Sequence, residues 1–245
     1  MLIEPILTDL RIESRSLGRV PFFIRLRHHG HMVFRPTELP PEPEWHLDVP
    51  RGRILAFAPH PDDEIAGPGG CLALHRRGLD PVRVVVASTG AAGDPERRFD
   101  PATYVDLRQQ ESRTGLGELG VTDVVYWGLP DNCALSPSDY EMGHQLATAA
   151  IREFEPNIIY LPWEAEGHPD HHALHLIVLE AMKLTAFSGS AFGYEVWNAM
   201  VPDIVVDITA VAEHKRRAIR AHRSQLAYVD FEHTILGLNA YRSMV

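Results

Sequence analysis

Histidine and aspartate residues gather in two short segments whose spacing suits a metal ion. The first is His60-Pro-Asp-Asp63, in which a nitrogen ligand and an oxygen ligand lie three residues apart. The second, His168-Pro-Asp-His171, follows about a hundred residues later. Catalytic zinc sites commonly take three protein ligands, histidine nitrogens and carboxylate oxygens, and keep one position for water. The residue types therefore predict a metal site with His60, Asp63 and His171 as ligands.

Further polar residues of the two motifs have the chemistry of proton transfer. Asp62 is adjacent to a predicted ligand, and two neighbouring residues seldom both reach one ion, so we expect it to act as a base beside the metal. Desolvation and nearby acidic groups would raise the pKa of that carboxyl toward the range suited to base work. His168 could donate a proton to a developing oxyanion or to the leaving amine. Asp170 fits a hydrogen bond that orients a histidine through its other ring nitrogen.

Each motif alone has a simpler explanation. An isolated His-x-x-Asp pair is common, and the segment from His168 to His172 could be a polar loop in which Asp170 caps the following helix. His172 also duplicates His171 and is an alternative ligand. The metal interpretation therefore depends on whether the fold brings the two motifs together.

Short apolar runs alternate with segments of helical spacing along the chain. The apolar runs suit strands buried on both faces, and they lie at residues 53–58, 82–88, 121–127, 157–162, 192–197 and 203–207. Helices are predicted at residues 64–77, 104–119, 138–154, 171–187 and 210–224. Strands separated by helices imply an α/β fold with a mainly parallel sheet and right-handed crossovers.

The two motifs begin where two predicted strands end. Residues 59–64 follow the strand at 53–58, and residues 167–172 come shortly after the strand at 157–162. In open parallel sheets, ligands bind outside the carboxyl ends of the strands. We therefore expect both motifs at one edge of the sheet.

Composition excludes several classes of protein. The 245-residue chain is 45% hydrophobic and 23% charged, as in soluble globular proteins, and its net charge of −10 argues against a nucleic-acid binder. It shows neither a signal peptide nor an apolar run near the ~20 residues that span a bilayer. Two cysteines without metal-type spacing indicate no disulfide framework, so we expect a cytoplasmic protein. A homo-oligomer is compatible with these data.

Residues 1–50 differ from the remainder of the chain. They contain six arginines, a histidine cluster at residues 28, 29 and 31, and a proline-rich stretch at residues 36–45. Prolines at this density favour an extended arm or linker. We predict an N-terminal arm of unknown role at residues 1–50 and one α/β domain at residues 51–245.

The paired motifs resemble those of the LmbE-like (PIG-L) de-N-acetylase family. Residues 59–64, PHPDDE, follow an apolar strand, and the HPDH of residues 168–171 comes later. Residues 107–111 and 128–131 resemble the family's central helix and next strand, and residues 215–225 resemble its C-terminal helix. The likeness covers roughly residues 52–242. It does not cover the arm, and longer family members continue beyond the point where this chain ends.

The resemblance implies a Rossmann-like, three-layer α/β/α fold and a zinc ion on His60, Asp63 and His171, with Fe²⁺ as an alternative metal. It also implies that Asp62 is the general base and His168 the electrophilic or acid partner. Arg108 matches the family's substrate- or oxyanion-contacting arginine; the alternative is a helix-surface ion pair with Glu111. Asp131 is expected either to contact a sugar hydroxyl or to cap a turn.

The function so implied is removal of an N-acetyl group from an amino sugar of the GlcNAc type, in a glycoside or glycoconjugate. Three alternatives remain at this stage. The substrate could be a thiol conjugate or another small amide, two histidines and a carboxylate also describe non-haem iron oxygenases, and the fold could serve a sugar-binding protein without catalysis. The presence of both Asp62 and His168 argues against pure binding. A dinucleotide cofactor is not expected, because the first strand is followed by HPDDE and not by a glycine-rich fingerprint.

Overall fold

The computed structural model describes residues 42–131 and 136–244. The described residues belong to one compact unit of the chain, which begins at residue 42. The histidine cluster at residues 28–31 and most of the predicted arm lie outside the described residues.

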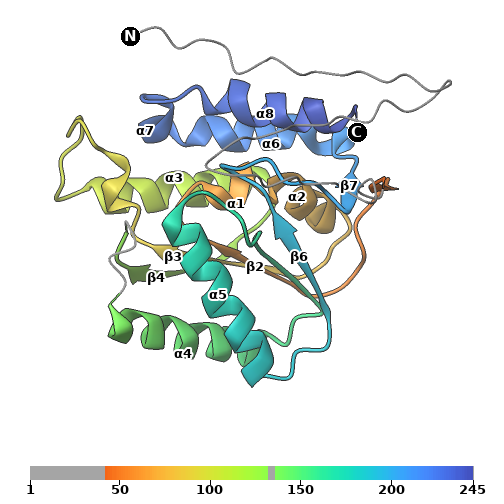
Figure 1. Ribbon diagram of the computed structural model, residues 1–245. Helices are drawn as coiled ribbons and strands as arrows, with labels where there is room; N and C mark the ends of the chain where they lie inside the picture. Colours follow the sequence, from red (N-terminus) through yellow and green to blue (C-terminus); the bar gives the residue numbers. More distant parts are fainter. Residues whose placement is uncertain (1–41, 132–135, 245) are drawn as a thin grey trace, which may run out of the picture. The chain divides into compact units, whose positions relative to one another are not determined.

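A five-stranded parallel sheet forms the centre of the described unit (Figure 1). Its order is β4-β3-β2-β5-β6, and the strands are β2 (Ile54–Ala58), β3 (Val82–Ser88), β4 (Asp123–Leu129), β5 (Ile158–Pro162) and β6 (Ser190–Tyr194). The central strands β2 and β5 are buried at every position. Their β-branched and apolar residues suit such a position because a parallel sheet is covered on both faces. Successive side chains of β2 enter different cores, Leu55 and Phe57 on one face and Ile54 and Ala56 on the other.

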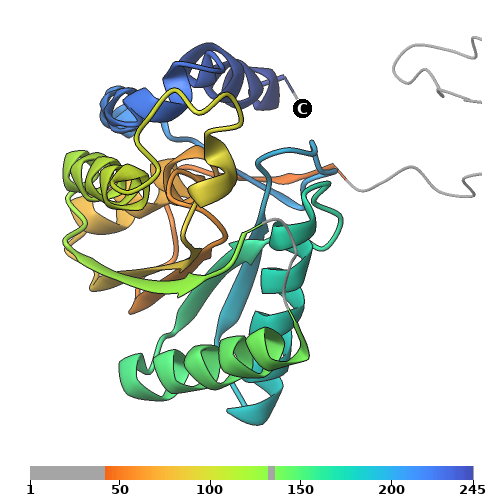
Figure 2. The same ribbon diagram turned by 90° about the vertical axis from the view of Figure 1, so that its left-hand side faces the viewer.

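Helices cover both faces of this sheet, as Figures 1 and 2 show. One layer consists of α4 (Pro137–Phe154) and α5 (Pro169–Leu184). The other contains α1 (Asp63–Ala66), α2 (Gly69–Arg77), α3 (Tyr104–Glu118) and α6 (Ala212–Ala221). Two further helices, α7 (Arg223–Leu226) and α8 (Phe231–Arg242), follow α6 and pack against this second layer. The predicted three-layer α/β/α fold with a mainly parallel sheet is confirmed.

A second, two-stranded sheet joins segments far apart in the sequence. Strand β1 (Glu44–His46) pairs in parallel with β7 (Ile204–Val206), with Trp45 opposite Val205. Strand β1 belongs to the segment that the proline content marked as an arm. Two short 3-10 turns, η1 (Ala91–Gly93) and η2 (Thr209–Val211), complete the described elements. None of the helices in the described part of the chain has the length and apolar character to cross a membrane.

The helix predicted over residues 64–77 is two helices, α1 and α2, separated at Gly67 and Pro68. A Cβ added to Gly67 would lie 2.2 Å from the ring of Tyr194, so only glycine permits this close approach of α1 to β6. Lys215 Nζ donates to the carbonyls of Ala66 and Gly67 and so satisfies the end of α1. The break sets the short α1 apart as a turn that carries the first motif.

The order of the strands reverses between β2 and β5. From β2 the chain continues through β3 to β4 on one side, and it returns to build β5 and β6 on the other side. Such a switch point leaves a crevice outside the carboxyl ends of the two strands. The first motif, His60 to Asp63, follows β2 and runs into the first residue of α1, and the second, His168 to His171, follows β5 and forms the start of α5. The sheet topology therefore places both motifs beside the same crevice.

Candidate active site

The two motifs meet, and three histidine rings lie together. The ring centroid of His60 is 4.8 Å from that of His168 and 5.4 Å from that of His171. Each of the three offers a ring nitrogen, and these nitrogens lie within 4.8 Å of one another. His171 is fully buried, whereas His60 and His168 are partly accessible. His172 turns away, because its Nδ1 lies 3.1 Å from the carbonyl oxygen of Glu164 on the surface.

Asp63 lies between two of these histidines. Its Oδ2 is 3.0 Å from His60 Nδ1 and 3.1 Å from His171 Nε2. Ligands bound at about 2.1 Å in a tetrahedral arrangement lie about 3.4 Å apart, so both of these separations are close to those between zinc ligands. His168 is the less suitable third ligand, because its Nδ1 accepts a hydrogen bond from the Asp170 amide at 3.2 Å. The donor set His60, Asp63 and His171 therefore fits a divalent cation.

The electrostatics of the site favour positive charge. Burial lowers the pKa of His60, but hydrogen bonds and charge from Asp170 and Asp63 outweigh this effect and raise the pKa to about 10. Burial likewise lowers the pKa of His171, and Asp63 and Glu166 raise it to about 9. Burial would raise the pKa of Asp63, but the two histidines hold it far below its usual value. A divalent cation would replace the positive charge that the carboxylates hold on these two rings.

Asp62 lies beside this donor set in an uncommon backbone conformation. Its φ is 148°, a value that L residues rarely adopt. Glu64 Oε2 accepts a hydrogen bond from the Asp62 amide at 2.9 Å, and Ser112 Oγ donates to Glu64 Oε1 at 2.6 Å. Burial raises the pKa of Asp62 to about 6, aided by the charge of Asp63 and opposed by Arg108. The pKa of the Asp62 carboxyl is thus close to neutral pH.

Arg108 reaches this site from α3. It is 2% exposed, its Nη2 lies 3.1 Å from Asp62 Oδ2, and it also donates to the carbonyls of Pro61 and Gly90. The alternative of a helix-surface ion pair with Glu111 is wrong, because Glu111 binds Ser224 and Arg108 points inward. Arg108 therefore orients the Asp62 carboxylate.

Asp131 lies two residues after the end of β4 and lines the same pocket. Its Oδ1 accepts from the amide of Gly90 at 2.9 Å and from the hydroxyl of Thr89, and its Oδ2 accepts from the amide of Ala92. The carboxylate thus fixes the turn at residues 89–92, as the capping alternative for Asp131 requires.

Asp170 and His168 occupy the first turn of α5. Asp170 Oδ2 lies 2.9 Å from His60 Nε2, so it orients a histidine from the other motif. His168, and not Asp170, caps the helix with its side chain. Burial and the nearby charges of His60 and His171 lower the pKa of His168. A neutral His168 that accepts at Nδ1 carries its proton on Nε2.

Glu166 is a part of the site that the sequence did not single out. Its side chain is buried, and Oε2 lies 3.5 Å from His171 Nδ1. Histidine ligands commonly direct their second nitrogen at a carboxylate, which fixes the ring and its tautomer. A carboxylate in the loop just before the second motif is the signal that could have identified it. Glu64 thus supports the predicted base Asp62, and Glu166 supports the predicted ligand His171.

The pocket above the histidines has a volume of about 280 Å³. Its polar side contains the predicted site residues, with the exception of Asp170 and His171. Its other side is largely apolar and is formed by the loop after β6 and by the C-terminal helices, with Val196, Trp197, Ile219, Tyr228, Val229, Phe231 and Ile235. The pocket therefore has one charged side, which holds the predicted site residues, and one largely apolar side.

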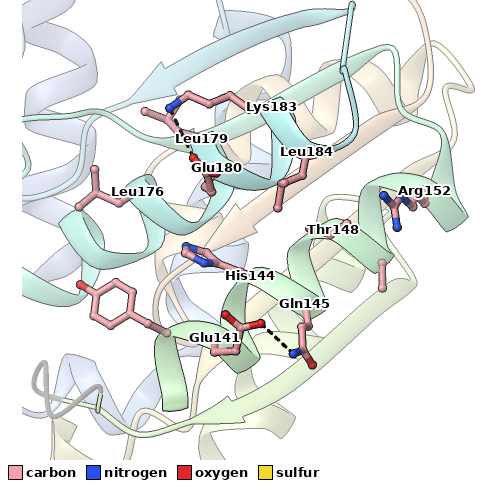
Figure 3. Close-up of a pocket in the computed structure, with 12 residues that line it drawn as sticks. Glu141, His144, Gln145, Thr148, Arg152, Leu176, Leu179, Glu180, Lys183 and Leu184 are labelled. Carbon is pink, nitrogen blue, oxygen red and sulfur yellow. Dashed lines mark hydrogen bonds and ion pairs between the residues drawn. The ribbon is translucent and has the colours of Figure 1, made fainter. Parts of the chain in front are cut away.

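A larger hollow, of about 880 Å³, lies between α4 and α5 and is open to solvent (Figure 3). Tyr140, His144, Leu176 and Lys183 are among the side chains that line it. None of the predicted site residues does so. It is a surface groove between two helices and is not the candidate active site.

Comparison with known proteins identifies the family. The family model for GlcNAc-PI de-N-acetylase, PIG-L, matches residues 55–182. A probable N-acetyl-α-D-glucosaminyl L-malate deacetylase 2 of Bacillus subtilis is 31% identical over 187 residues, which are 70% of this chain and 82% of the relative. The diacetylchitobiose deacetylase of Thermococcus kodakarensis is 29% identical over 192 residues, 71% of this chain and 70% of that enzyme.

Solved structures share the fold. A conserved protein from Thermus thermophilus superposes with a TM-score of 0.63 and 26% identity, and the match covers 79% of this chain and 86% of that one. The family model spans more than half of the chain and includes both metal motifs. The chain therefore belongs to the PIG-L, or LmbE-like, family of de-N-acetylases.

Proposed function

We propose that this protein is a zinc-dependent hydrolase that removes the N-acetyl group from a GlcNAc-type amino sugar, in a glycoside or glycoconjugate. The observation that carries the proposal is the single oxygen, Asp63 Oδ2, within 3.1 Å of ring nitrogens from both motifs. Asp62, with a pKa of about 6, lies beside it. The deacetylases among the relatives supply the substrate class.

In the proposed enzyme His60, Asp63 and His171 hold the metal. When bound there, the ion acts as a Lewis acid that polarises the acetamide carbonyl and acidifies water. Asp170 keeps the His60 ring in place through a hydrogen bond at Nε2, and Glu166 forms an ion pair with His171 Nδ1 at 3.5 Å. Two histidines and one carboxylate are donors typical of catalytic zinc. Ferrous iron is the alternative metal.

Asp62 is the proposed general base. Its carboxylate accepts the proton of the attacking water, and a pKa near 6 lets it both take that proton and release it at neutral pH. Two contacts fix the Asp62 carboxylate in one orientation. Arg108 pairs with the carboxylate, and the backbone amide of Asp62 donates a hydrogen bond to Glu64. The base is therefore held ready before substrate arrives.

His168 is the proposed electrophilic or acid partner. Its Nδ1 accepts from the Asp170 amide, so the proton on Nε2 is available to the developing oxyanion or to the leaving amine. A single donor to an oxyanion is worth about 3–4 kcal/mol of transition-state stabilisation. Asp131 and Arg108 are the remaining predicted substrate contacts. Each would bind the sugar through hydrogen-bonding positions that face the pocket and are not already used within the protein.

Three alternatives differ in chemistry. An amidase for thiol conjugates or other small amides would use the same metal and base, with a different group on the amide nitrogen. A non-catalytic sugar-binding protein would not need Asp62 held by Arg108 in a strained backbone. An iron oxygenase usually sits on a β-barrel, whereas this site lies at the switch point of a parallel sheet.

The test is acetate release by the metal-loaded protein from a panel of N-acetylated glycosides, N-acetylated thiol conjugates and simple acetamides. Release from the glycosides, with equimolar acetate and free amine, supports the proposal. Release from the thiol conjugates alone would assign the protein to the amidases. No release from any compound, with stoichiometric metal bound, would contradict a hydrolase. Reconstitution with Zn²⁺ and, under argon, with Fe²⁺ identifies the working metal.

A further inference from the structure

An exposed tryptophan stands inside the pocket. Trp197 lies between β6 and β7, lines the pocket with its side chain and is 60% exposed. Its ring centroid is 5.9 Å from that of His168, with an angle of 36° between the ring planes. Large apolar side chains exposed in a pocket commonly mark a ligand-binding surface.

The backbone of this loop is anchored although the ring is exposed. The Glu166 carboxylate accepts from the amide of Val196 at 2.5 Å and from the amide of Trp197 at 3.0 Å. The Trp163 indole donates to the carbonyl of Asn198, whose side chain donates to Ala165. A side chain presented on fixed backbone loses little conformational freedom when a ligand binds. Trp197 is therefore a prearranged surface.

The same carboxylate that holds Trp197 also contacts the predicted metal ligand His171. Glu166 therefore sets the distance between the indole and the reacting centre. His168 neighbours both rings, 5.2 Å from His171 and 5.9 Å from Trp197, measured between ring centroids. Because His168 and Trp197 line the same pocket, the group on the nitrogen of an acetamide bound at His168 would be within reach of Trp197.

In an amino sugar the group on that nitrogen is the pyranose ring. One face of a pyranose presents mainly C–H groups and its edge presents hydroxyls, and indole combines a broad apolar face with one polar N–H. Resting on the deacetylase activity proposed above, we propose that Trp197 is the wall on which the pyranose ring of the substrate packs. Trp197 thus distinguishes ring-bearing amides from acyclic ones.

The first test compares two substrates in the metal-loaded full-length protein. One is methyl 2-acetamido-2-deoxyglucopyranoside, and the other is N-(2-hydroxyethyl)acetamide, which has the same acetamide and no ring. Trp197→Ala is expected to raise KM for the glycoside by a factor of about five to ten with little change in kcat. Trp197→Phe should recover most of the loss. Neither variant should alter kcat/KM for the acyclic amide.

The matched control is Trp45→Ala, since Trp45 is 50% exposed on β1 and does not line the pocket. Its KM should equal that of the wild type. An unchanged KM for the glycoside in Trp197→Ala would overturn the proposal. An equal loss of kcat/KM for both amides would also overturn it, because it would mean that Trp197 acts only by supporting His168. A changed oligomeric state of Trp197→Ala in light scattering, without a change in KM, would assign the ring to a subunit contact and likewise overturn it.

A second readout does not depend on turnover. Tryptophan fluorescence of the Asp62→Asn protein is titrated with the methyl glycoside and, separately, with acetate. A blue shift with the glycoside that is lost in the Asp62→Asn/Trp197→Phe double variant supports packing of the pyranose ring on Trp197. No shift, or a shift that survives the second substitution, contradicts it. If the wild type releases no acetate from any glycoside, the deacetylase proposal fails, and this titration alone decides the role of Trp197.

Discussion

Asp62 combines three properties that rarely occur together in one residue. It has a φ of 148°, it is partly buried beside another carboxylate, and its side chain is held by a buried arginine. Backbone in such a region costs about 1–3 kcal/mol and persists only where its surroundings impose it. Here Glu64 binds the Asp62 amide and Arg108 binds the preceding carbonyl of Pro61. The cost is explained if the orientation of this carboxylate matters for proton transfer.

Replacing Asp62 by Asn tests that role. The side-chain volume is kept, Arg108 retains an oxygen partner, and the three metal ligands are untouched. Because the base is lost, kcat should fall by a factor of about 10²–10⁴. Metal content by mass spectrometry should remain stoichiometric. A variant that turns over at a near-normal rate with full metal would remove Asp62 from the role of base.

His222, also at the pocket, makes the stability of the protein sensitive to acid. Its ring is 2% exposed, and both ring nitrogens lack a hydrogen-bond partner among the described residues. Burial lowers the pKa of His222 to about 3, and the charge of Arg108 acts in the same direction. The unfolded chain therefore binds a proton at His222 below about pH 6.5 that the folded chain does not bind until near pH 3. The free energy of unfolding must fall as the pH falls through this window.

His222→Leu removes this proton uptake. Between pH 6.5 and pH 5, the wild type should lose about 2 kcal/mol more unfolding free energy than the variant. The comparison uses urea unfolding at both pH values, so that contributions from other groups cancel. Parallel pH profiles for the two proteins would show that His222 is protonated in the folded state.

At the scale of elements, the C-terminal helices complete the site. Helix α7 is bound to α3 through Glu111, which accepts from the Ser224 amide at 2.9 Å and from the Ser224 hydroxyl at 2.6 Å. The next residue, Gln225, donates to the hydroxyl of Tyr104 and to the carbonyl of Gly93. These bonds tie α7 to α3 and to the loop that Asp131 fixes. The apolar side of the pocket depends on this attachment.

Glu111→Ala should therefore destabilise the protein by about 3 kcal/mol, because it leaves two buried donors of Ser224 without an acceptor. The matched control on the same helix is Glu118→Ala. Glu118 pairs with Arg217 at 2.7 Å, but both side chains are about 40% exposed. An exposed pair contributes less than about 1 kcal/mol. Equal losses in urea unfolding for the two variants would contradict the importance of the Glu111 contact.

For the whole molecule, the buried charge of the site predicts that metal stabilises the fold. The ligand set combines residues of both motifs, which follow the neighbouring strands β2 and β5. Metal that binds the folded chain alone adds about 2.7 kcal/mol at a hundredfold excess over Kd. For a protein of this size that corresponds to a rise in Tm of about 5–10 °C.

Chelation followed by readdition of Zn²⁺ tests this by calorimetry. The wild type should lose and regain this increment in Tm. Asp63→Asn should respond weakly, since it lacks the oxygen that lies between the two histidines. An unchanged Tm of the wild type in chelator, with metal removal verified, would contradict a metal site built from both motifs.

Much of this architecture follows from local pattern. The apolar runs predicted β2, β3 and β5 within one residue at each end. Helix α8 was missed, because its apolar residues form no regular stripe and only Ile235 is buried. Strand β1 was missed because prolines precede it and its partner β7 lies some 160 residues away.

The sequence by itself determined the fold class, the family and the meeting of the two motifs. A parallel sheet brings the ends of neighbouring strands together, and that rule needs no coordinates. Only the tertiary structure decided that Arg108 points inward to Asp62, that Glu166 supports His171, and that Trp197 faces the pocket. The physical reason is that these residues lie on crossover helices and on loops. No repeating sequence pattern indicates which of their side chains point toward the site. Their side-chain directions depend on packing between segments that no local pattern relates.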